Sequence, residues 1–351
     1  MLKARYFKHT LKFKKPGGTS RGILVTKDSW FIKLWHTDNL NFAGIGECSL
    51  IEGLSIDAVP EFELVLQELC ESIHLLPITN NRFDLNFLKW PAIAFGLQLA
   101  LWDLHDKGRK TFEAQFQKAG AIPINGLIWM GDKVSMKAQI NACISAGFTC
   151  IKLKIGAINF SDELNLLKFM RKEFRLSDLE IRVDANGAFS TNEAMEKIKR
   201  LSEYQLHSIE QPIKAGLYSE MAQLCLKSPI DIALDEELIG PFDKTTKQQI
   251  LQEIKPQYIV VKPSLHGGFH GAEDWIEIAE SLGVGWWVTS ALESNIGLNG
   301  IARWVNKYDN LLPQGLGTGS LYSNNIDSPL FVSNGQLCYS EEDQWDLTLF
   351  K

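Results

Sequence analysis

Short apolar runs alternate with longer amphipathic segments from about residue 122 onward. Runs that are rich in β-branched and aromatic residues are typical of strands. They predict strands near residues 124–129, 149–155, 180–184, 207–210, 231–235, 257–262, 285–290 and 311–315. Segments of helical character or length lie between most of these runs, for example at 161–174, 191–204 and 271–282. Parallel strands need such crossovers, so the alternation predicts a parallel sheet covered by helices.

Charged residues end five consecutive strands of this predicted sheet. They are Lys154, Asp184, Glu210, Asp235 and Lys262, at intervals of 25 to 30 residues. Burying a charge without a partner is costly, so five charges at matching positions indicate a functional rim. An open doubly wound sheet concentrates its ligand contacts at one switch point, whereas a barrel draws them from many strand ends. The pattern therefore predicts a TIM-like α/β barrel, of the modified (β/α)7β form, over residues 119–324.

The first part of the chain has the pattern of an α+β domain. Strands are predicted at residues 3–14 and 23–36, and helices near 58–74 and 91–107. We expect residues 1–118 to form a capping domain, completed by 325–351, where the strand-like run LFVSNG returns to the composition of the first part. The glycine-rich stretch PGGTSRG at 16–22 predicts a loop, which is either a simple turn or a mobile lid over a pocket. On closure, Arg21 is expected to reach the substrate.

The overall composition argues against several kinds of binding partner and against a membrane or secreted location. Hydrophobic residues make up 45% and charged residues 22% of the chain, and the formal net charge of −6 gives no attraction to nucleic acid or anionic membranes. No apolar stretch approaches the roughly 20 residues of a membrane span, and the start lacks the apolar core of a signal peptide. Six cysteines without CxxC spacing argue against a zinc site and a disulfide framework. We expect a cytoplasmic protein that acts on a small molecule, whether as a monomer or as a homo-oligomer.

Three of the five strand-end residues are carboxylates, and no soft ligand accompanies them. Oxygen-only sites select hard cations, and few carboxylates with room for water and substrate suit Mg²⁺, for which Mn²⁺ can substitute. Without a cation, the negative charges of Asp184, Glu210 and Asp235 would repel one another and their pKa values would rise. The sequence therefore predicts a divalent metal site on these three residues.

Lysines flank the predicted metal site on both sides. Lys152 and Lys154 are two residues apart on one strand, so their side chains point to the same side. Two neighbouring ammonium groups lower each other's pKa, which suits a general base near neutral pH. Lys262, on the sixth predicted strand, is expected to face Lys154 across the barrel mouth. Removing a proton α to a carboxylate gives an enediolate, which requires concentrated positive charge of this kind.

At these residues the chain resembles the enolase superfamily, in its muconate-lactonising subgroup, over essentially its full length. The segments that carry the likeness are IKLKIG, RVDANGAF, IEQPI, ALDEEL and VVKPSLHGGF. The resemblance implies a small-molecule carboxylate substrate, with Lys154 and Lys262 as the acid–base residues. It also implies that Asp184, Glu210 and Asp235 hold the metal.

Four further segments are similar to a group of synthases from the menaquinone pathway: PGGTSRG, GECSLIEGLS, TSALESNIGLNG and QGLGTGSLY. This likeness implies the syn-dehydration of a cyclohexadiene carboxylate that carries a succinyl chain. Lys154 would take the α-proton and return it to the departing hydroxyl. Lys262 would contribute charge against the ring face, without a required proton transfer.

Residues beyond the five strand ends are expected to contact the substrate. Glycine permits close backbone approach, so Ser290, Gly317 and Gly319 are expected to hold the succinyl carboxylate through N–H groups, unless GLGTG is only a tight turn. Arg182 lies two residues before Asp184 and points the same way, so we expect it to order the lysine side of the site.

The nearest alternative is a dipeptide epimerase or an N-acylamino-acid racemase on the same scaffold, because two opposed lysines also suit a two-base epimerisation. Dipeptide epimerases usually carry an aspartate pair after the eighth strand, where this chain has GLGTGSLY and no acid until Asp327. The racemase stays open, since that activity can accompany the synthase on one site. A non-catalytic barrel would lack a metal ligand or a lysine of the pattern, and the sequence retains them all.

Overall fold

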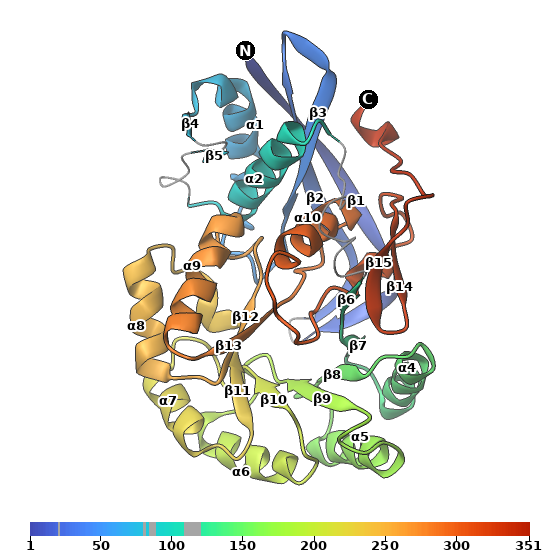
Figure 1. Cartoon of the computed structure of the whole chain (residues 1–351). Coiled ribbons are helices and arrows are strands. Elements are labelled where there is room, and N and C mark those ends of the chain that lie inside the picture. The colour runs from blue at the N-terminus through green and yellow to red at the C-terminus, as the bar shows by residue number, and fades with distance from the viewer. Residues whose placement is uncertain (20–21, 80–81, 84–88, 109–120) are drawn as a thin grey trace.

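The computed structural model describes residues 1–19, 22–79, 82–83, 89–108 and 121–351. An antiparallel sheet from the N-terminal part lies above a curled parallel sheet that carries helices on its outer face (Figure 1). This arrangement confirms the predicted α/β barrel with an α+β part before it. Among the described residues, no helix combines the length and the apolar character needed to cross a bilayer.

The parallel sheet of the described residues has seven strands, in the order β13-β12-β11-β10-β9-β8-β7. These strands are β7 (Gly126–Ile128), β8 (Cys150–Lys154), β9 (Glu180–Asp184), β10 (Ser208–Glu210), β11 (Asp231–Leu234), β12 (Tyr258–Val261) and β13 (Gly285–Val288). The helices that accompany them are α4 (Lys133–Ser145), α5 (Phe160–Glu173), α6 (Thr191–Ser202), α7 (Tyr218–Lys227), α8 (Lys244–Ile254), α9 (Gly268–Ser281) and α10 (Asn295–Val305). The first seven predicted strands of the barrel are therefore confirmed; β9 has the predicted bounds and the others are shorter than expected.

Side chains of the parallel strands alternate between the covering helices and the barrel interior, as a period of two requires. On β8, Leu153 is part of the main hydrophobic core, whereas Lys152 beside it points inward to the carboxylates of β9 and β10. A small apolar layer of Ala233, Val260 and Trp287 fills the interior below the charged rim. The alternation thus sets polar groups at the rim above an apolar plug.

The eighth predicted strand, 311–315, is not a continuous strand. Only Gln314 and Gly315 form parallel bridges there, one to the residue two before β7 and one to the residue just after β13, and these bridges close the barrel. Pro313 has no N–H group with which to extend the ladder. The Gln314 side chain takes over part of the ladder's role, since its oxygen accepts a hydrogen bond from the Val288 N–H at 2.7 Å.

The antiparallel sheet has the order β1-β2-β3, with strands β1 (Leu2–Thr19), β2 (Gly22–His36) and β3 (Asn39–Ser49). Helices α1 (Phe62–Ser72) and α2 (Pro91–His105) pack against it, and the short elements η1 (Ile73–Leu75), β4 (Ile78–Thr79) and β5 (Arg82–Phe83) lie between them in the chain. Pro91 occupies the first turn of α2, where no N–H is needed. Gly46 lets α2 approach β3 closely, because a Cβ there would lie 1.9 Å from the Gly96 carbonyl oxygen.

The predicted loop at 16–22 is wrong in its described part, because β1 continues through Thr19 and β2 begins at Gly22. The ladder between the two strands shifts register between Lys12 and Gly17 and then resumes. Residues 20–21, and with them the predicted contact of Arg21, lie outside the described residues.

The end of this hairpin pairs with the barrel, which explains why its glycine-rich residues are extended. Gly18 forms an antiparallel bridge with Met130, after β7. The Lys14 N–H donates to the Leu321 carbonyl at 2.8 Å. The hairpin therefore receives backbone partners from two barrel loops that are distant in sequence.

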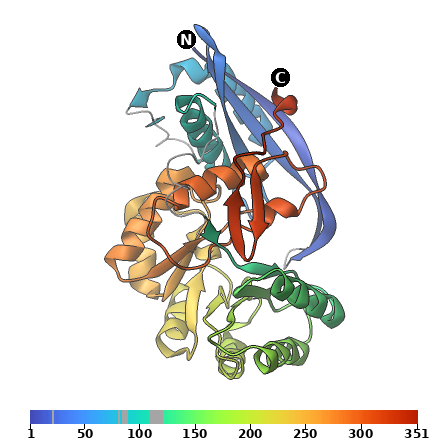
Figure 2. The same cartoon turned by 45° about the vertical axis from the view of Figure 1, so that its right-hand side comes forward.

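The last part of the chain contacts both the barrel side and the N-terminal sheet. Strands β14 (Leu330–Ser333) and β15 (Gln336–Tyr339) form a small antiparallel sheet with β6 (Ile122–Pro123). The final turn η4 (Thr348–Phe350) reaches the N-terminal sheet (Figure 2), where the Phe350 ring lies 5.8 Å from Phe7 and 5.3 Å from Phe31. The predicted boundary between 118 and 119 falls outside the described residues, so the division into two domains stays a prediction.

Candidate active site

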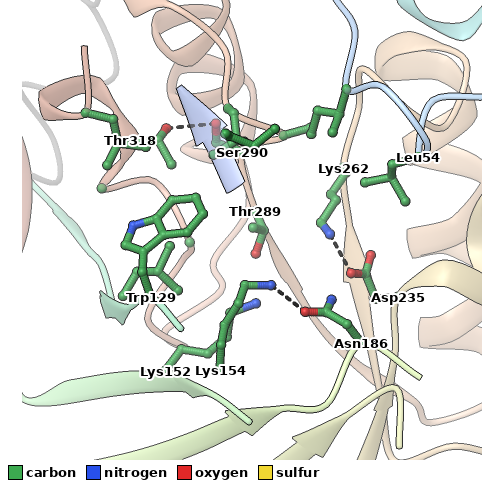
Figure 3. Close-up of a pocket in the computed structure, with 18 of the residues that line it drawn as sticks. Leu54, Trp129, Lys152, Lys154, Asn186, Asp235, Lys262, Thr289, Ser290 and Thr318 are labelled. Carbon is green, nitrogen blue, oxygen red and sulfur yellow. Dashed lines mark hydrogen bonds and ion pairs between the residues drawn. The ribbon is translucent and has the colours of Figure 1, made fainter. Parts of the chain in front are cut away.

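A cavity of about 760 Å³ opens at the carboxyl ends of the parallel strands (Figure 3). Lysines and carboxylates at the ends of β8, β11 and β12 line it at the barrel rim. The N-terminal part covers it with residues 22–24 of β2 and with the loop at 51–54. Trp129, after β7, forms a wall. The cavity therefore lies where the capping sheet meets the barrel rim.

The structure brings most of the residues singled out from the sequence to this cavity. Those that line it are Lys152, Lys154, Asp235, Lys262, Ser290 and Gly317. Asp184 and Glu210 are buried beside Lys152 and do not line the cavity themselves. Arg182 and Gly319 also lie outside its lining.

Two carboxylates enclose Lys152. Its Nζ lies 3.0 Å from Asp184 Oδ2 and 2.8 Å from Glu210 Oε2. Lys154 also donates to Asp184 Oδ2, at 3.0 Å, and to Asn186 Oδ1, at 2.7 Å. The parallel register causes this arrangement, because Lys154 and Glu210 both stand opposite Asp184 on the neighbouring strands. The two lysines therefore share one carboxylate.

Lys262 lies across the cavity from the lysine pair (Figure 3). Its ammonium group donates to Asp235 Oδ2 at 2.5 Å, and its backbone N–H donates to His266 Nδ1 at 3.2 Å. Burial lowers the pKa of His266 to about 3, so the ring is neutral and Nδ1 can accept this hydrogen bond. Both ends of Lys262 are thereby anchored.

The pKa values of the residues at the strand ends agree only in part with the sequence-based expectation. Burial alone would lower the pKa of Lys152, but Asp184 and Glu210 outweigh burial and the pKa is raised. The expected lowering of this pKa by a neighbouring ammonium group is therefore wrong. Burial and the charge of Asp184 raise the pKa of Glu210 to about 8, as expected. The pKa values of Asp184 and Asp235 are lowered instead, since the neighbouring lysines outweigh their burial.

The three expected metal ligands have donor chemistry that fits a hard cation. Asp184, Glu210 and Asp235 follow one another around the sheet and are each at most 1% exposed. Asp235 Oδ1 is buried without a hydrogen-bond partner, which leaves one oxygen able to accept a cation. In the described part of the chain, however, no three His, Cys, Asp or Glu side chains converge as a metal site does, and the Lys152 ammonium lies between two of these carboxylates.

Arg182 lies one layer below the rim, contrary to the expectation that it orders the lysine side of the site. Its guanidinium donates to Glu180 Oε1 at 2.7 Å and to the Pro313 carbonyl at 2.9 Å. It also lies 4.3 Å over the Trp287 ring. These contacts tie the closing segment at 313–315 to β9, so Arg182 supports the barrel wall.

Hydroxyl groups form the part of the wall that Ser290 belongs to. Ser290, after β13, shares hydrogen bonds with Glu293 and, at 2.8 Å, with Thr318 Oγ1. Thr318 begins the short helix η3 (Thr318–Ser320) and lines the cavity. Gly319 is packed away from the cavity, because a Cβ there would lie 2.6 Å from Asn295 Oδ1. The segment GLGTG is therefore partly cavity lining and partly a helical turn.

The sequence reasoning did not single out Trp129, Asn186, Thr289 and Thr318, which also line the cavity. Thr289 follows the inward-facing Trp287 by two residues, so the alternation along β13 could have placed it at the rim. Its hydroxyl is buried without a hydrogen-bond partner. Trp129 and Thr318 come from loops, which show no periodic signal.

Trp129 is positioned by both a helix and the hairpin. Gln139 of α4 accepts from the Trp129 N–H at 2.9 Å and donates to the Trp129 carbonyl at 3.2 Å. The indole lies edge-on to Phe13, with ring centroids 6.3 Å apart. Gly17 leaves room for it, since a Cβ there would lie 3.0 Å from the ring. The hairpin therefore packs on Trp129 at the edge of the cavity.

A parallel barrel with opposed lysines and buried carboxylates at one cavity defines a scaffold for acid–base catalysis. Residues 135–338 match the family described as enolase C-terminal domain-like, and the chain belongs to the enolase superfamily. Enzymes of this superfamily use a divalent metal ion.

Relatives and solved structures agree with this family. The chain is 46% identical to an o-succinylbenzoate synthase from Desulfotalea psychrophila, over 96% of this chain and 98% of the relative. The crystal structure of MenC from Desulfotalea psychrophila is similar with a TM-score of 0.84 and 41% identity, over 96% of this chain and 99% of that chain. A muconate lactonizing enzyme from Pseudomonas fluorescens, complexed with muconolactone, has a TM-score of 0.82 at 20% identity, over 96% of this chain and 93% of that chain. This last likeness concerns the fold alone.

Proposed function

We propose that this chain is an o-succinylbenzoate synthase of menaquinone biosynthesis. The reaction is the syn-dehydration of 2-succinyl-6-hydroxy-2,4-cyclohexadiene-1-carboxylate to 2-succinylbenzoate through an enediolate. The observation that carries the proposal is the identity of 46% to such a synthase over nearly the whole of both chains. The enzyme is then a lyase that acts in the cytoplasm on a small-molecule carboxylate.

Asp184, Glu210 and Asp235 are the proposed ligands of the divalent cation, with Mg²⁺ as the expected ion and Mn²⁺ as a substitute. When bound, the cation supplies positive charge that stabilises an enediolate. The oxygen-only donor set and the unpartnered Oδ1 of Asp235 support this assignment.

Lys154 is the proposed base. It lines the cavity, and its Nζ donates to Asn186, which in turn donates to Glu236 Oε1 at 3.1 Å. Lys154 removes the proton α to the ring carboxylate and then returns it to the departing hydroxyl, which leaves as water. The syn course follows, because the proton and the hydroxyl leave from the face at which Lys154 stands.

Lys262 is proposed to act by charge alone. It is held by Asp235 and faces the cavity from the side opposite Lys154. An ammonium group in this position stabilises an electron-rich ring face without taking up a proton. Two lysines at one site therefore have separate roles.

The remaining lining is proposed to bind and enclose the substrate. Trp129 and the β2 residues 22–24 add apolar surface, which suits a carbocyclic ring and limits the access of water. Ser290 and Gly317 line the part of the cavity that is proposed to hold the succinyl chain. Arg182 and Gly319 do not line the cavity, so they are no longer assigned to the substrate.

A direct assay tests the proposed function. The purified protein with Mg²⁺ should convert the cyclohexadiene substrate to its aromatic product, followed by ultraviolet absorbance. Chelation of the metal should abolish the conversion, and added Mg²⁺ should restore it. If this conversion were absent while the protein exchanged the α-hydrogen of N-acyl amino acids or dipeptides for deuterium, the proposal would be overturned.

One observation favours a second candidate, an N-acylamino-acid racemase or a dipeptide epimerase. Lys154 and Lys262 lie on opposite sides of the cavity, which is the arrangement that a two-base epimerisation needs. The segment 315–322 offers no carboxylate for the ammonium group of a dipeptide, so the racemase is the stronger of the two. The same deuterium exchange assay measures both activities beside the dehydration.

A further inference from the structure

A buried carboxyl group, Glu293, lies behind the cavity wall and outside the acid–base residues described above. Its side chain is 0% exposed. Oε1 shares a hydrogen bond with Ser264, and Oε2 shares one with Ser290. Ser290 in turn contacts Thr318, and both of these residues line the cavity (Figure 3). A chain of hydroxyl groups thus runs from Glu293 to the cavity.

The direction of this chain depends on the charge of Glu293. A hydroxyl group can either donate or accept, so the 2.8 Å contact between Ser290 Oγ and Thr318 Oγ1 is compatible with both directions. If Glu293 were ionised, Ser290 would donate to it, Thr318 would donate to Ser290, and only lone pairs would face the cavity. If Glu293 carried a proton on Oε2, it would donate to Ser290, Ser290 would donate to Thr318, and the Thr318 hydroxyl would point its proton toward the cavity, while Ser264 would still donate to Oε1.

A second buried carboxyl group, Glu47 of β3, lies in the same region. It accepts from the Ser294 N–H at 2.9 Å and from the Gly297 N–H at 2.9 Å, both at the start of α10. It also accepts from the Ser29 hydroxyl at 2.8 Å. A backbone N–H can only donate and a helix N-terminus favours an anion, so Glu47 is the carboxyl group that carries negative charge.

Among the residues that the structure describes, the cation whose charge acts on both carboxyl groups is Lys27 of β2. Lys27 is 7% exposed, and its ammonium group donates to Ser29 at 2.9 Å, beside Glu47. Tyr322 faces them too, but it is neutral, since burial raises its pKa and its hydroxyl donates to the Leu292 carbonyl. One ammonium group balances one carboxylate, and a second buried negative charge would be uncompensated.

The hydrogen-bond partners and the charge balance both place a proton on Glu293. Its partners are hydroxyl groups, which can accept a hydrogen bond, whereas the partners of Glu47 include groups that can only donate. Burial also raises the pKa of Glu293, against the lowering effect of Ser264 and Ser290.

We propose that Glu293 is a neutral carboxylic acid and a positioning residue, which makes the Thr318 hydroxyl a hydrogen-bond donor toward the cavity. Glu293 donates its proton to Ser290, and Ser290 donates to Thr318. The Thr318 hydroxyl then binds the second carboxylate of the substrate, a step that rests on the proposed function. A hydrogen-bond donor at this part of the cavity favours a substrate with an anionic tail and disfavours one with an ammonium group. The hydroxyl groups of Ser290 and Thr318 would therefore select against free dipeptides.

Infrared difference spectroscopy tests the proton on Glu293 without any substrate. The spectrum of the wild-type protein minus that of Glu293→Gln, at neutral pH, should contain the C=O stretching band of a protonated carboxylic acid. A difference that contains only the bands of an ionised carboxylate would overturn the proposal and would leave the proposed function untouched.

Binding of the product tests the direction of the hydroxyl chain. Calorimetry with Mg²⁺ present compares 2-succinylbenzoate with benzoate, which lacks the succinyl tail and serves as the internal control for an intact site. A glutamine amide donates to Ser290 as a neutral acid does, so Glu293→Gln should keep the preference for 2-succinylbenzoate. Glu293→Ala and Thr318→Val should each lose about tenfold of that preference, the value of one hydrogen bond to a charged group.

Two outcomes of this titration distinguish a failure of the Glu293 proposal from a failure of the contact with the succinyl tail. Equal losses in Glu293→Gln and Glu293→Ala would overturn the proposal, because they would show that negative charge organises the chain. Binding of benzoate without any preference for 2-succinylbenzoate in the wild type would overturn the tail contact, while the infrared band still decides the protonation of Glu293.

Discussion

Lys154 and Lys262 stand on opposite sides of one cavity, but their hydrogen-bond partners differ. Lys154 donates to the neutral amide of Asn186 as well as to Asp184, whereas Lys262 donates to Asp235. Hydrogen bonds from an ammonium group to a carboxylate are roughly twice as strong as neutral ones, and they hold the proton on the lysine. An amide partner positions Nζ without adding a negative charge. Each lysine thus donates to one carboxylate, and the additional contact with Asn186 fixes the position of Lys154 Nζ beside the cavity, which suits the base proposed above.

Replacement of the two lysines separates their roles. Lys154→Ala should lower kcat for dehydration by about a thousandfold, because a positioned general base contributes roughly 10²- to 10⁴-fold. Lys262→Ala should lower it less, since only charge stabilisation is lost. Steady-state kinetics with Mg²⁺ measure both variants, and circular dichroism checks that each is folded. Near-normal rates in Lys154→Ala beside a large loss in Lys262→Ala would reverse the assignment of the base.

The alternation of side-chain directions along the strands determined which individual site residues could be predicted from the sequence. Lys154, Asp184 and Glu210 gather at one rim because each ends a strand in matching register, and that pattern is visible in the sequence. Trp129 reaches the cavity from a loop that Gln139 pins at both the N–H and the carbonyl, so its position depends on tertiary contacts. The raised pKa of Lys152 depends on distances to two carboxylates, which no spacing in the sequence reveals.

Among the elements, helix α2 begins at an unusual buried carboxyl group. Asp57 accepts from the Ala92 N–H at 2.8 Å, is 3% exposed, and leaves its Oδ1 without a hydrogen-bond partner. Burial raises the pKa of Asp57 from 3.8 to about 6, although the Ala92 hydrogen bond opposes the shift. The start of α2 is therefore sensitive to pH.

Asp57→Asn should remove this sensitivity. The folded-state pKa lies above the unfolded value, so the stabilising effect of the proton is present below about pH 4 and is lost as the pH rises through about 6. The loss should reach roughly 3 kcal/mol at neutral pH. Asparagine still offers an oxygen to Ala92 and carries no charge. The difference in unfolding free energy between the wild type and the variant, from denaturant titrations, should change by about this amount between pH 3 and 7, and a constant difference would contradict the prediction.

Close packing of α2 on β3 gives a second test at the scale of elements. Gly46→Ala should lower the unfolding free energy by about 2 kcal/mol, since its Cβ would lie 1.9 Å from the Gly96 carbonyl oxygen and α2 would have to move. Gly131→Ala is the matched control, because the nearest atom to its Cβ would be 3.4 Å away. Thermal unfolding followed by circular dichroism compares the two, and equal melting temperatures would argue against the close contact.

Periodicity predicted the elements that bury a continuous face and misjudged those that depend on partners. Helix α2 and the strands β7 to β13 show their buried faces in the sequence. Residues 311–315 are apolar enough for a strand, but Pro313 lacks an N–H and the Gln314 side chain accepts the Val288 N–H, so the regular ladder is interrupted. Residues 16–19 resemble a loop, yet residues 17–19 pair with β2, and Gly18 also pairs with Met130 of a barrel loop.

For the molecule as a whole, the cavity is complete only because the hairpin of the N-terminal sheet reaches the barrel. Spacing along the sequence predicted the barrel, but the position of the sheet above it depends on contacts such as Glu47 with Ser294, which are 247 residues apart. The Ser49 hydroxyl and the Ala291 carbonyl add a further contact of this kind, at 3.4 Å. Contacts between residues so far apart in the chain cannot be inferred from the spacing of residue types.

Displacement of the hairpin should weaken substrate binding more than catalysis. In Gly18→Val, a Cβ would lie 2.4 Å from the Met130 carbonyl oxygen, so the hairpin would have to leave the cavity edge. KM should rise by about tenfold, equivalent to about 1.4 kcal/mol of binding, with kcat little changed. Thr26→Ala, at an exposed position of β2, is the control. If Gly18→Val had the same KM and kcat as Thr26→Ala, the hairpin would not be needed to close the cavity.

The two bridges at residues 314–315 make this barrel a ring with a seam between β7 and β13. Trp129, Ser290 and Gly317 flank the seam, whereas the lysines and carboxylates stand at the ends of the regularly paired strands β8 to β12. A regular ladder ties each strand to the register of its neighbours, while a seam held by two bridges constrains them less. Substitutions that reshape the pocket for a different acyl chain can therefore accumulate along the seam while the acid–base residues keep their positions. The fold in this way separates a part that preserves the chemistry from a part that is free to acquire new specificity.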